Sequence, residues 1–131
     1  MKNIELVARA VILNGNKIIL CRIKGENWYF LPGGHIEFDE FIEASLKREL
    51  MEEMGIKVKL DKVIEVVENF YKENRKNHHE INIIFSGTTM NRKVSTKEPH
   101  IEFEYIDTKH IKNKSILPKQ LKPLLIRWLK K

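Results

Sequence analysis

With 131 residues, the chain has the length of one folded domain, and a hydrophobic content of 42% is enough for a single core. Charged residues make up 32% of the sequence, as in a soluble surface, and the formal net charge is +6. A basic surface attracts nucleotide phosphates, nucleic acid or an anionic membrane, but a generally lysine-rich proteome explains the charge equally well, so the charge alone does not identify a partner. We expect one domain over residues 1–131, because no repeat, linker or low-complexity segment interrupts the sequence.

The sequence argues against several classes of protein. Cys21 is the only cysteine, which excludes an internal disulfide and argues against a small secreted domain held by disulfides. No stretch approaches the roughly 18–20 consecutive apolar residues needed to cross a bilayer. Arg9 interrupts an N-terminal apolar run that is already too short for a signal peptide. We therefore expect a cytoplasmic protein that does not enter a membrane.

The first third of the chain predicts three strands and a glycine turn. Residues 6–13 and 17–23 are rich in aliphatic residues and flank the Asn-Gly-Asn sequence of residues 14–16, a strong hairpin signal. Residues 28–31 predict a short aromatic strand that leads into the Pro-Gly-Gly turn of residues 32–34. Glycine in this turn lets the backbone take positive φ and approach a ligand closely.

A helix over residues 40–54 follows this turn. Asp39 is the expected N-cap, because its carboxylate can accept hydrogen bonds from the unpaired N–H groups of the first turn. Gly55 is suited to the left-handed conformation that ends many helices. Apolar residues recur at helical spacing along one stripe, and they are Ile42, Leu46, Leu50 and Met54.

Three carboxylates share one face of this helix. Glu49, Glu52 and Glu53 are spaced at i, i+3 and i+4, and Glu49 and Glu53 fall at the edge of the apolar stripe. Like charges at these spacings repel each other, and Arg48 supplies only one positive charge to offset them. Hard oxygen ligands suit Mg²⁺ or Mn²⁺, so we favour a metal site over a solvated acidic face.

The helix lies within a longer pattern, G-x5-E-x7-R-E-U-x-E-E-x-G-U, where U is a bulky aliphatic residue. Residues 34–56 match it at all nine specified positions, which is a specific signal. This segment resembles the Nudix box, the signature of the Nudix hydrolases. Many family members carry glycine where Asp39 stands, outside the specified positions. The matching residues are Gly34, Glu40, Arg48, Glu49, Leu50, Glu52, Glu53, Gly55 and Ile56.

The resemblance implies a Mg²⁺-dependent pyrophosphohydrolase, with Mn²⁺ as a substitute ion. Glu52 and Glu53 are expected as the principal metal ligands, and Glu49 as a ligand or base. Arg48 is expected to orient a carboxylate, and Glu40 to support the loop or a metal-bound water.

Further ligands are expected outside the helix. The resemblance implies a backbone carbonyl at the start of the box, from Gly33 or Gly34, beside the carboxylates. It also implies one more acid from the polar loop before the last strand. Glu98 and Glu102 are the candidates, and the sequence leaves this choice open.

The middle of the chain predicts two strands joined by a polar turn. Residues 58–71 are expected to form one long strand, or a pair broken near Asp61. A polar turn is expected at residues 73–77, and residues 80–89 predict the next strand.

The C-terminal third predicts one strand and one helix. Apolar and polar residues alternate over residues 101–106, as in a half-buried strand, and Asp107 is suited to cap a short helical turn. Pro118 is expected in the first turn of a helix over residues 119–130. One apolar face of that helix consists of Leu121, Leu124, Leu125, Trp128 and Leu129.

Two groups of residues outside the box raise alternatives. The His-His-Glu sequence of residues 78–80 suggests zinc, but adjacent residues of an extended chain point to opposite faces and no other Cys or His completes a convincing ligand set. We expect a solvated loop or strand edge there, with a phosphate or base contact as the alternative. Four aromatic residues are expected in the sheet core, with stacking on a base as the alternative: Trp28, Tyr29, Phe70 and Tyr71.

The order of elements predicts an α/β sandwich with a mixed sheet, and the resemblance implies a central mixed sheet between the box helix and a C-terminal helix. The favoured substrate is a nucleoside diphosphate derivative, either a nucleoside triphosphate, normal or oxidised, or ADP-ribose. An RNA 5′-end pyrophosphohydrolase and a non-catalytic nucleotide-sensing module are the alternatives. The intact set of carboxylates argues against the sensor. A homodimer is one expected assembly, because members of the family are often dimers.

Overall fold

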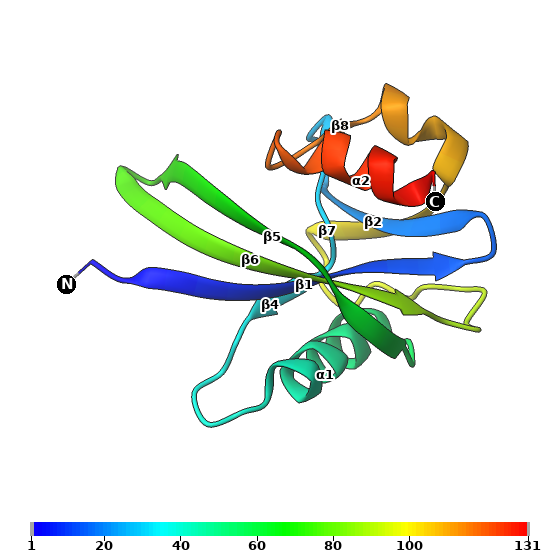
Figure 1. Cartoon of the computed structure of the whole chain (residues 1–131), viewed down its shortest axis with the longest axis horizontal. Helices are drawn as coiled ribbons and strands as arrows, with labels where there is room; N and C mark the ends of the chain where they lie inside the picture. The colour runs from blue at the N-terminus through cyan, green and yellow to red at the C-terminus, as the bar shows by residue number, and fades with distance from the viewer. Residues whose placement is uncertain (1, 131) are drawn as a thin grey trace.

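The computed structural model describes residues 2–130 and has a sheet with helices on both faces (Figure 1). Helix α1 (Ile42–Met54) covers one face, and helix α2 (Leu121–Leu129) and the 3-10 helix η1 (Thr108–Asn113) cover the other. The strands are β1 (Ile4–Asn14), β2 (Lys17–Ile23), β3 (Trp28–Tyr29), β4 (Gly33–His35), β5 (Lys59–Glu73), β6 (Lys76–Thr88), β7 (Ile101–Asp107) and β8 (Ser115–Ile116).

The central sheet is mixed. Its strands follow the order β5-β6-β1-β2-β7, with β4 also paired to β1. β1 and β6 are parallel, whereas the other pairs of this sheet are antiparallel. The short strands β3 and β8 form a separate parallel pair. The expected α/β class, with a mixed sheet between two helices, is confirmed.

Two strands share one edge of β1. β4 pairs with residues 7–9 of β1, and β2 pairs with residues 13–14. Between these two regions, the Ala10 N–H donates a hydrogen bond to the Pro32 carbonyl at 3.0 Å. Helix α1 packs on both β1 and β4. The start of the box is therefore held against the helix that carries its carboxylates.

Apolar clusters on the two faces of the sheet hold the helices in place. Side chains alternate between the faces along β1. On one face, Ala8, Ala10 and Ile12 pack with the apolar stripe of α1. On the other face, Val11 belongs to the cluster that includes Leu121 and Leu125 of α2. Three residues of the expected stripe are fully buried: Leu46, Leu50 and Met54.

The start of α1 differs from the prediction. The helix begins at Ile42 with Phe41 at the N-cap position, and no side chain caps it. The expected cap, Asp39, lies instead in a turn with a φ of 69°, a conformation that Asp tolerates better than most residues. Glu40 lies outside the helix and is bound by Arg48. Gly55 does end the helix with a left-handed φ of 66°, as expected.

Gly33 explains why the expected turn at residues 32–34 continues as strand β4. Its φ is 145°, and a Cβ atom at this position would lie 2.1 Å from the Ala8 carbonyl oxygen. Only glycine allows β4 to approach β1 so closely. The pairing partner lies more than 20 residues earlier in the chain, so the local sequence does not show this strand.

The β5–β6 hairpin is longer than predicted. Its turn consists of Asn74 and Arg75, whose φ values of 52° and 66° are those of a type I′ turn. Residues 76–79, expected in the turn or a loop, therefore belong to β6. β5 is a single strand, and the expected break near Asp61 is an irregularity in its pairing between Leu60 and Glu65.

The C-terminal helix begins later than predicted. Asp107 accepts a hydrogen bond from the Lys109 N–H and caps η1, as expected. Pro118 lies before α2 rather than in its first turn. Pro123 occupies that turn, where a missing N–H costs no helical hydrogen bond.

Candidate active site

The carboxylate of Glu49 lies against the backbone at the start of the box. A Cβ atom on Gly34 would lie 3.1 Å from Glu49 Cδ and 3.2 Å from its Oε2. Glycine at this position therefore leaves the space that the carboxylate occupies. The Glu49 side chain is 20% exposed, so it is largely removed from water although it is ionisable.

Arg48 connects three of the acids of the box. Its guanidinium binds both oxygens of Glu40 in a bidentate pair, with two N–O distances of 3.0 Å. The same group reaches Glu52 at 3.2 Å and Glu49 at 3.6 Å. The hydrogen bond to Arg48 lowers the pKa of Glu40, and the hydrogen bond to Glu40 raises the pKa of Arg48. Arg48 thus contacts the carboxylates of Glu40, Glu49 and Glu52 together.

Glu53 is the acid of the box with the most perturbed environment. Burial, a hydrogen bond with Glu49 and the negative charges of Glu49 and Glu98 raise its pKa to about 8. Arg9 opposes this shift but does not cancel it. Glu53 therefore lies among acids with too little positive charge nearby, and a cation could bind there favourably.

The two candidates for a further acid lie in different places. Glu98 is close enough for its charge to raise the pKa of Glu53. Its loop is tied to the end of α1, because the Lys97 N–H donates to the Glu53 carbonyl at 3.2 Å. Glu102 instead forms an ion pair of 3.0 Å with Arg22 on the sheet. The structure brings Glu98, and not Glu102, to the carboxylates of α1.

A cleft of about 660 Å³ lies on the α2 side of the sheet and was not predicted from the sequence. Arg9 lines it and donates hydrogen bonds of 2.9 Å to Asn82 Oδ1 and to the Leu31 carbonyl. A charged residue in an otherwise apolar strand was the only sequence signal for this position. Other lining residues include Trp28, Phe30, Asn69, Phe70, Tyr71, Glu80 and residues 117–120.

The aromatic residues are less buried than predicted. Phe70 is 68% exposed, and it lines the cleft together with Trp28 and Tyr71. The prediction that these three belong to the core is wrong, because none of them packs in either apolar cluster that residues 2–130 form on the sheet. Tyr29 does pack against the α2 cluster.

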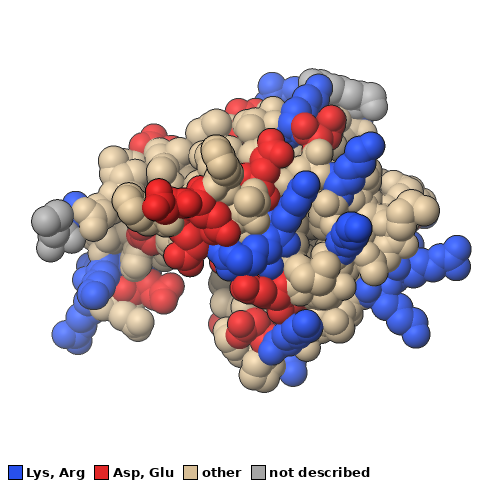
Figure 2. Space-filling view, turned by 90° about the horizontal axis from the view of Figure 1, so that it is seen from below, with Lys and Arg blue, Asp and Glu red and all other residues tan. Residues whose placement is uncertain are grey.

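Acidic side chains gather on the face that carries α1. Figure 2 shows that face, with groups of acidic residues near its centre and lysine and arginine side chains between and around them. The overall excess of positive charge therefore does not extend over the box helix.

The NUDIX domain model of known protein families matches residues 4–129. This chain belongs to the NUDIX family. A MutT-like protein of Streptomyces ambofaciens is 35% identical over 63 residues, which are 48% of this chain and 41% of the relative. An 8-oxo-dGTP diphosphatase of Buchnera aphidicola is 34% identical over 68 residues, 48% of this chain and 52% of the relative. The chain thus spans about half the length of these two relatives.

Other similarities extend over more of the chain. The nucleoside triphosphatase NudI of Escherichia fergusonii is 29% identical over 108 residues, which are 73% of this chain and 77% of the relative. A NUDIX hydrolase structure from Clostridium perfringens has a TM-score of 0.79 at 19% identity, and the match covers 98% of this chain and 97% of the Clostridium chain. A mutator MutT structure from Bacillus halodurans has a TM-score of 0.81 at 20% identity, with coverages of 97% and 83%. These structures share the Nudix fold.

Within residues 2–130, no helix is both long and apolar enough to span a bilayer.

The stability of the metal-free protein should depend on the protonation of Glu53. Its carboxyl keeps a proton up to about pH 8 in the folded state but ionises near its ordinary pKa of 4.5 when unfolded. The folded state therefore binds more protons in this window, and the free energy of unfolding should fall as the pH rises from 4.5 to 8. Glu53→Gln cannot ionise and should flatten this part of the profile. Urea unfolding with a chelator measures both profiles, and equal slopes would contradict the prediction.

Proposed function

We propose that this Nudix protein is a Mg²⁺-dependent pyrophosphohydrolase that cleaves the diphosphate linkage of a nucleoside triphosphate, or a related nucleoside diphosphate derivative, by attack of water. The main support for the proposal is the grouping of Glu53 with Glu49, which lies against Gly34 at the start of the box, and with Glu98. Positive charge near these acids comes from Arg48, which binds Glu40 more closely than Glu49, and from Arg9, which does not cancel the shift in the pKa of Glu53.

The available ligands fit a hard divalent cation. Carboxylate oxygens of Glu49, Glu53 and Glu98 are the kind of ligand that Mg²⁺ and Mn²⁺ prefer. The carbonyl of Gly33 or Gly34 would add a backbone ligand. When bound, Mg²⁺ neutralises phosphate oxygens and lowers the pKa of a coordinated water.

Other residues would orient the ligands, accept a proton and stabilise the charge of the phosphates. Arg48 orients Glu52 through the 3.2 Å contact and anchors the loop through Glu40. The Glu49 carboxylate, largely shielded from bulk water, would bind the ion or accept a proton from the attacking water. Arg9 brings positive charge near Glu53, where the phosphates of a substrate would also gain from it.

The nucleoside of the substrate would bind in the cleft lined by Arg9. A volume of about 660 Å³ is within the range of small-molecule sites, and the exposed aromatic residues offer flat surfaces for a base. The relatives from Buchnera and Escherichia are named as a diphosphatase of 8-oxo-dGTP and a nucleoside triphosphatase. These names support a nucleoside triphosphate as the first substrate to test.

Glu53→Gln should abolish the activity while the fold remains. The change removes a negative ligand but keeps the shape of the side chain, so we expect a loss of at least about 100-fold in kcat/KM. Phosphate and pyrophosphate release would be measured with Mg²⁺ over a panel of normal and oxidised nucleoside triphosphates and ADP-ribose. Glu43→Gln, an exposed acid in the first turn of the same helix, is the matched control. Near-normal activity of Glu53→Gln would exclude the assigned role, and no hydrolysis by the wild type would favour a sensing module.

Glu98→Gln and Glu102→Gln should have different effects. Glu98 is placed near Glu53, so its loss should raise the Mg²⁺ concentration needed for half-maximal activity by about 10-fold or more. Glu102 binds Arg22 instead, so its loss should leave that concentration within about twofold. Mg²⁺ titrations of the rate measure both variants. The opposite pattern would show that Glu102 completes the site.

A further inference from the structure

Four metal-binding side chains meet on the α2 side of the sheet, near the start of β1. Strand pairing brings them together, because Glu5 of β1 lies opposite Glu80 of β6 and His35 of β4 lies opposite Val7 of β1. His78 precedes Glu80 by two residues in β6, so both point to the same face. The sequence predicts a solvated loop or strand edge at residues 78–80, because no other Cys or His completes a convincing ligand set, whereas the strand pairing brings His35 close to Glu5 and Glu80.

The distances within this group are those of a compact site. Glu5 contacts His35 Nε2 through one oxygen and His78 Nδ1 through the other, both at 2.7 Å. One ligand atom each from Glu5, His35 and Glu80 lies within 4.8 Å of the others. Tetrahedral bonds of 2.0–2.2 Å place ligand atoms roughly 3.3–3.6 Å apart, so small side-chain rotations would bring Glu5, His35 and Glu80 around one ion. His78 would complete the set from its position against Glu5.

Glu80 supplies an independent reason to expect a cation. Only 6% of this residue is exposed, and it lies directly opposite another carboxylate, that of Glu5. Among residues 2–130, its one side-chain hydrogen bond comes from Asn82 Nδ2 at 3.5 Å, and no ion pair reaches it. Arg9, the nearby guanidinium, is occupied by Asn82 and Leu31. In the part of the chain that the structure describes, the buried carboxylate of Glu80 therefore has no positive charge bound to it to offset the cost of its burial.

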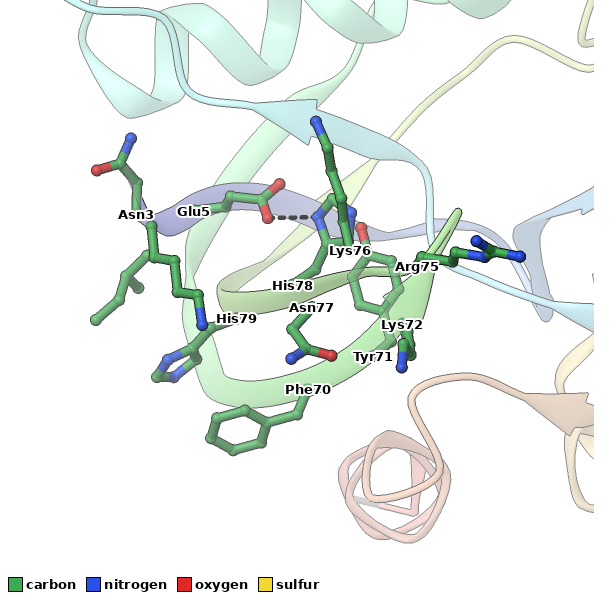
Figure 3. A pocket seen from close by; sticks show the side chains of 12 residues that line it. Asn3, Glu5, Phe70, Tyr71, Lys72, Arg75, Lys76, Asn77, His78 and His79 are labelled. Carbon is green, nitrogen blue, oxygen red and sulfur yellow. Dashed lines mark hydrogen bonds and ion pairs between the residues drawn. The ribbon is translucent and has the colours of Figure 1, made fainter.

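The group is open to solvent on one side. Glu5 and His78 line a cleft of about 1100 Å³, and Figure 3 shows the two side chains directed toward each other at its wall. The Tyr71 ring stacks on His78 with a centroid distance of 4.6 Å and an angle of 7° between the planes. This contact fixes the orientation of one imidazole before an ion arrives.

We propose that Glu5, His35, His78 and Glu80 form a Zn²⁺ site that is separate from the Nudix box. Two imidazoles and two carboxylates match the ligands of four-coordinate zinc, and imidazole nitrogens favour Zn²⁺ over Mg²⁺. The ion would join β1, β4 and β6. It would thereby hold the strand that includes Gly33 and Gly34, next to the carboxylates of α1.

Calorimetric titration of Zn²⁺ into the chelator-treated full chain tests this site. Glu49→Gln and Glu53→Gln would be present in every protein used, so that the box does not compete for the ion. We expect one Zn²⁺ per chain, with affinity reduced more than about 10-fold by His35→Gln or Glu80→Gln. His79→Gln is the matched control, because His79 lies on the other face and binds Glu68, and it should keep the affinity within about twofold.

Nuclear magnetic resonance of the imidazole nitrogens identifies the ligands directly. The chain has five histidines, and Zn²⁺ should shift the signals of His35 and His78 but not those of the other three. The His35 side chain is 63% exposed, so His35→Gln should fold normally and thermal unfolding would verify this for each variant. If Zn²⁺ does not bind, these residues form only a network of hydrogen bonds and ion pairs, and the proposal is wrong. Equal affinity in His35→Gln, Glu80→Gln and His79→Gln, or shifts confined to other histidines, would equally overturn the proposal.

Discussion

Repulsion among partly buried carboxylates is the constraint on which the arrangement of this protein depends. The apolar stripe of α1 packs against the sheet and fixes the helix, which holds Glu49 and Glu53 close together in a partly buried position. Arg48 relieves part of the repulsion, but its strongest contacts are with Glu40. What remains is an excess of negative charge at Glu53, where a divalent cation and the phosphates it carries would restore the balance.

Sequence periodicity predicted the features that depend on local geometry. The spacing of Leu46, Leu50 and Met54 defined the buried face of α1, and Gly55 marked its end. The same spacing placed the carboxylates together. Asp39 was the exception, because the position of the helix start depends on the Arg48–Glu40 pair, which is a tertiary contact and has no signature in local capping preferences.

Contacts between distant segments explain what the sequence did not predict. Glu98 lies in a polar loop without periodicity, and backbone hydrogen bonds from that loop to the end of α1 bring it to Glu53. The parallel pairing of β1 with β6 joins residues about 75 positions apart, so the proximity of Glu5 to Glu80 depends on a register that only the folded chain defines. The sequence wrongly predicted Trp28, Phe70 and Tyr71 to lie in the core, because their exposure also depends on how distant segments pack.

The thermal shift caused by Mg²⁺ tests the central claim most directly, because it reports binding to the carboxylates without requiring a substrate. At about 100 times its dissociation constant, an ion that binds only the folded state stabilises it by about 2.7 kcal/mol, which corresponds to roughly 5–10 °C for a chain of this size. We predict a shift of this size for the wild type and little or none for Glu53→Gln. No shift in the wild type, or equal shifts in both proteins, would contradict the account.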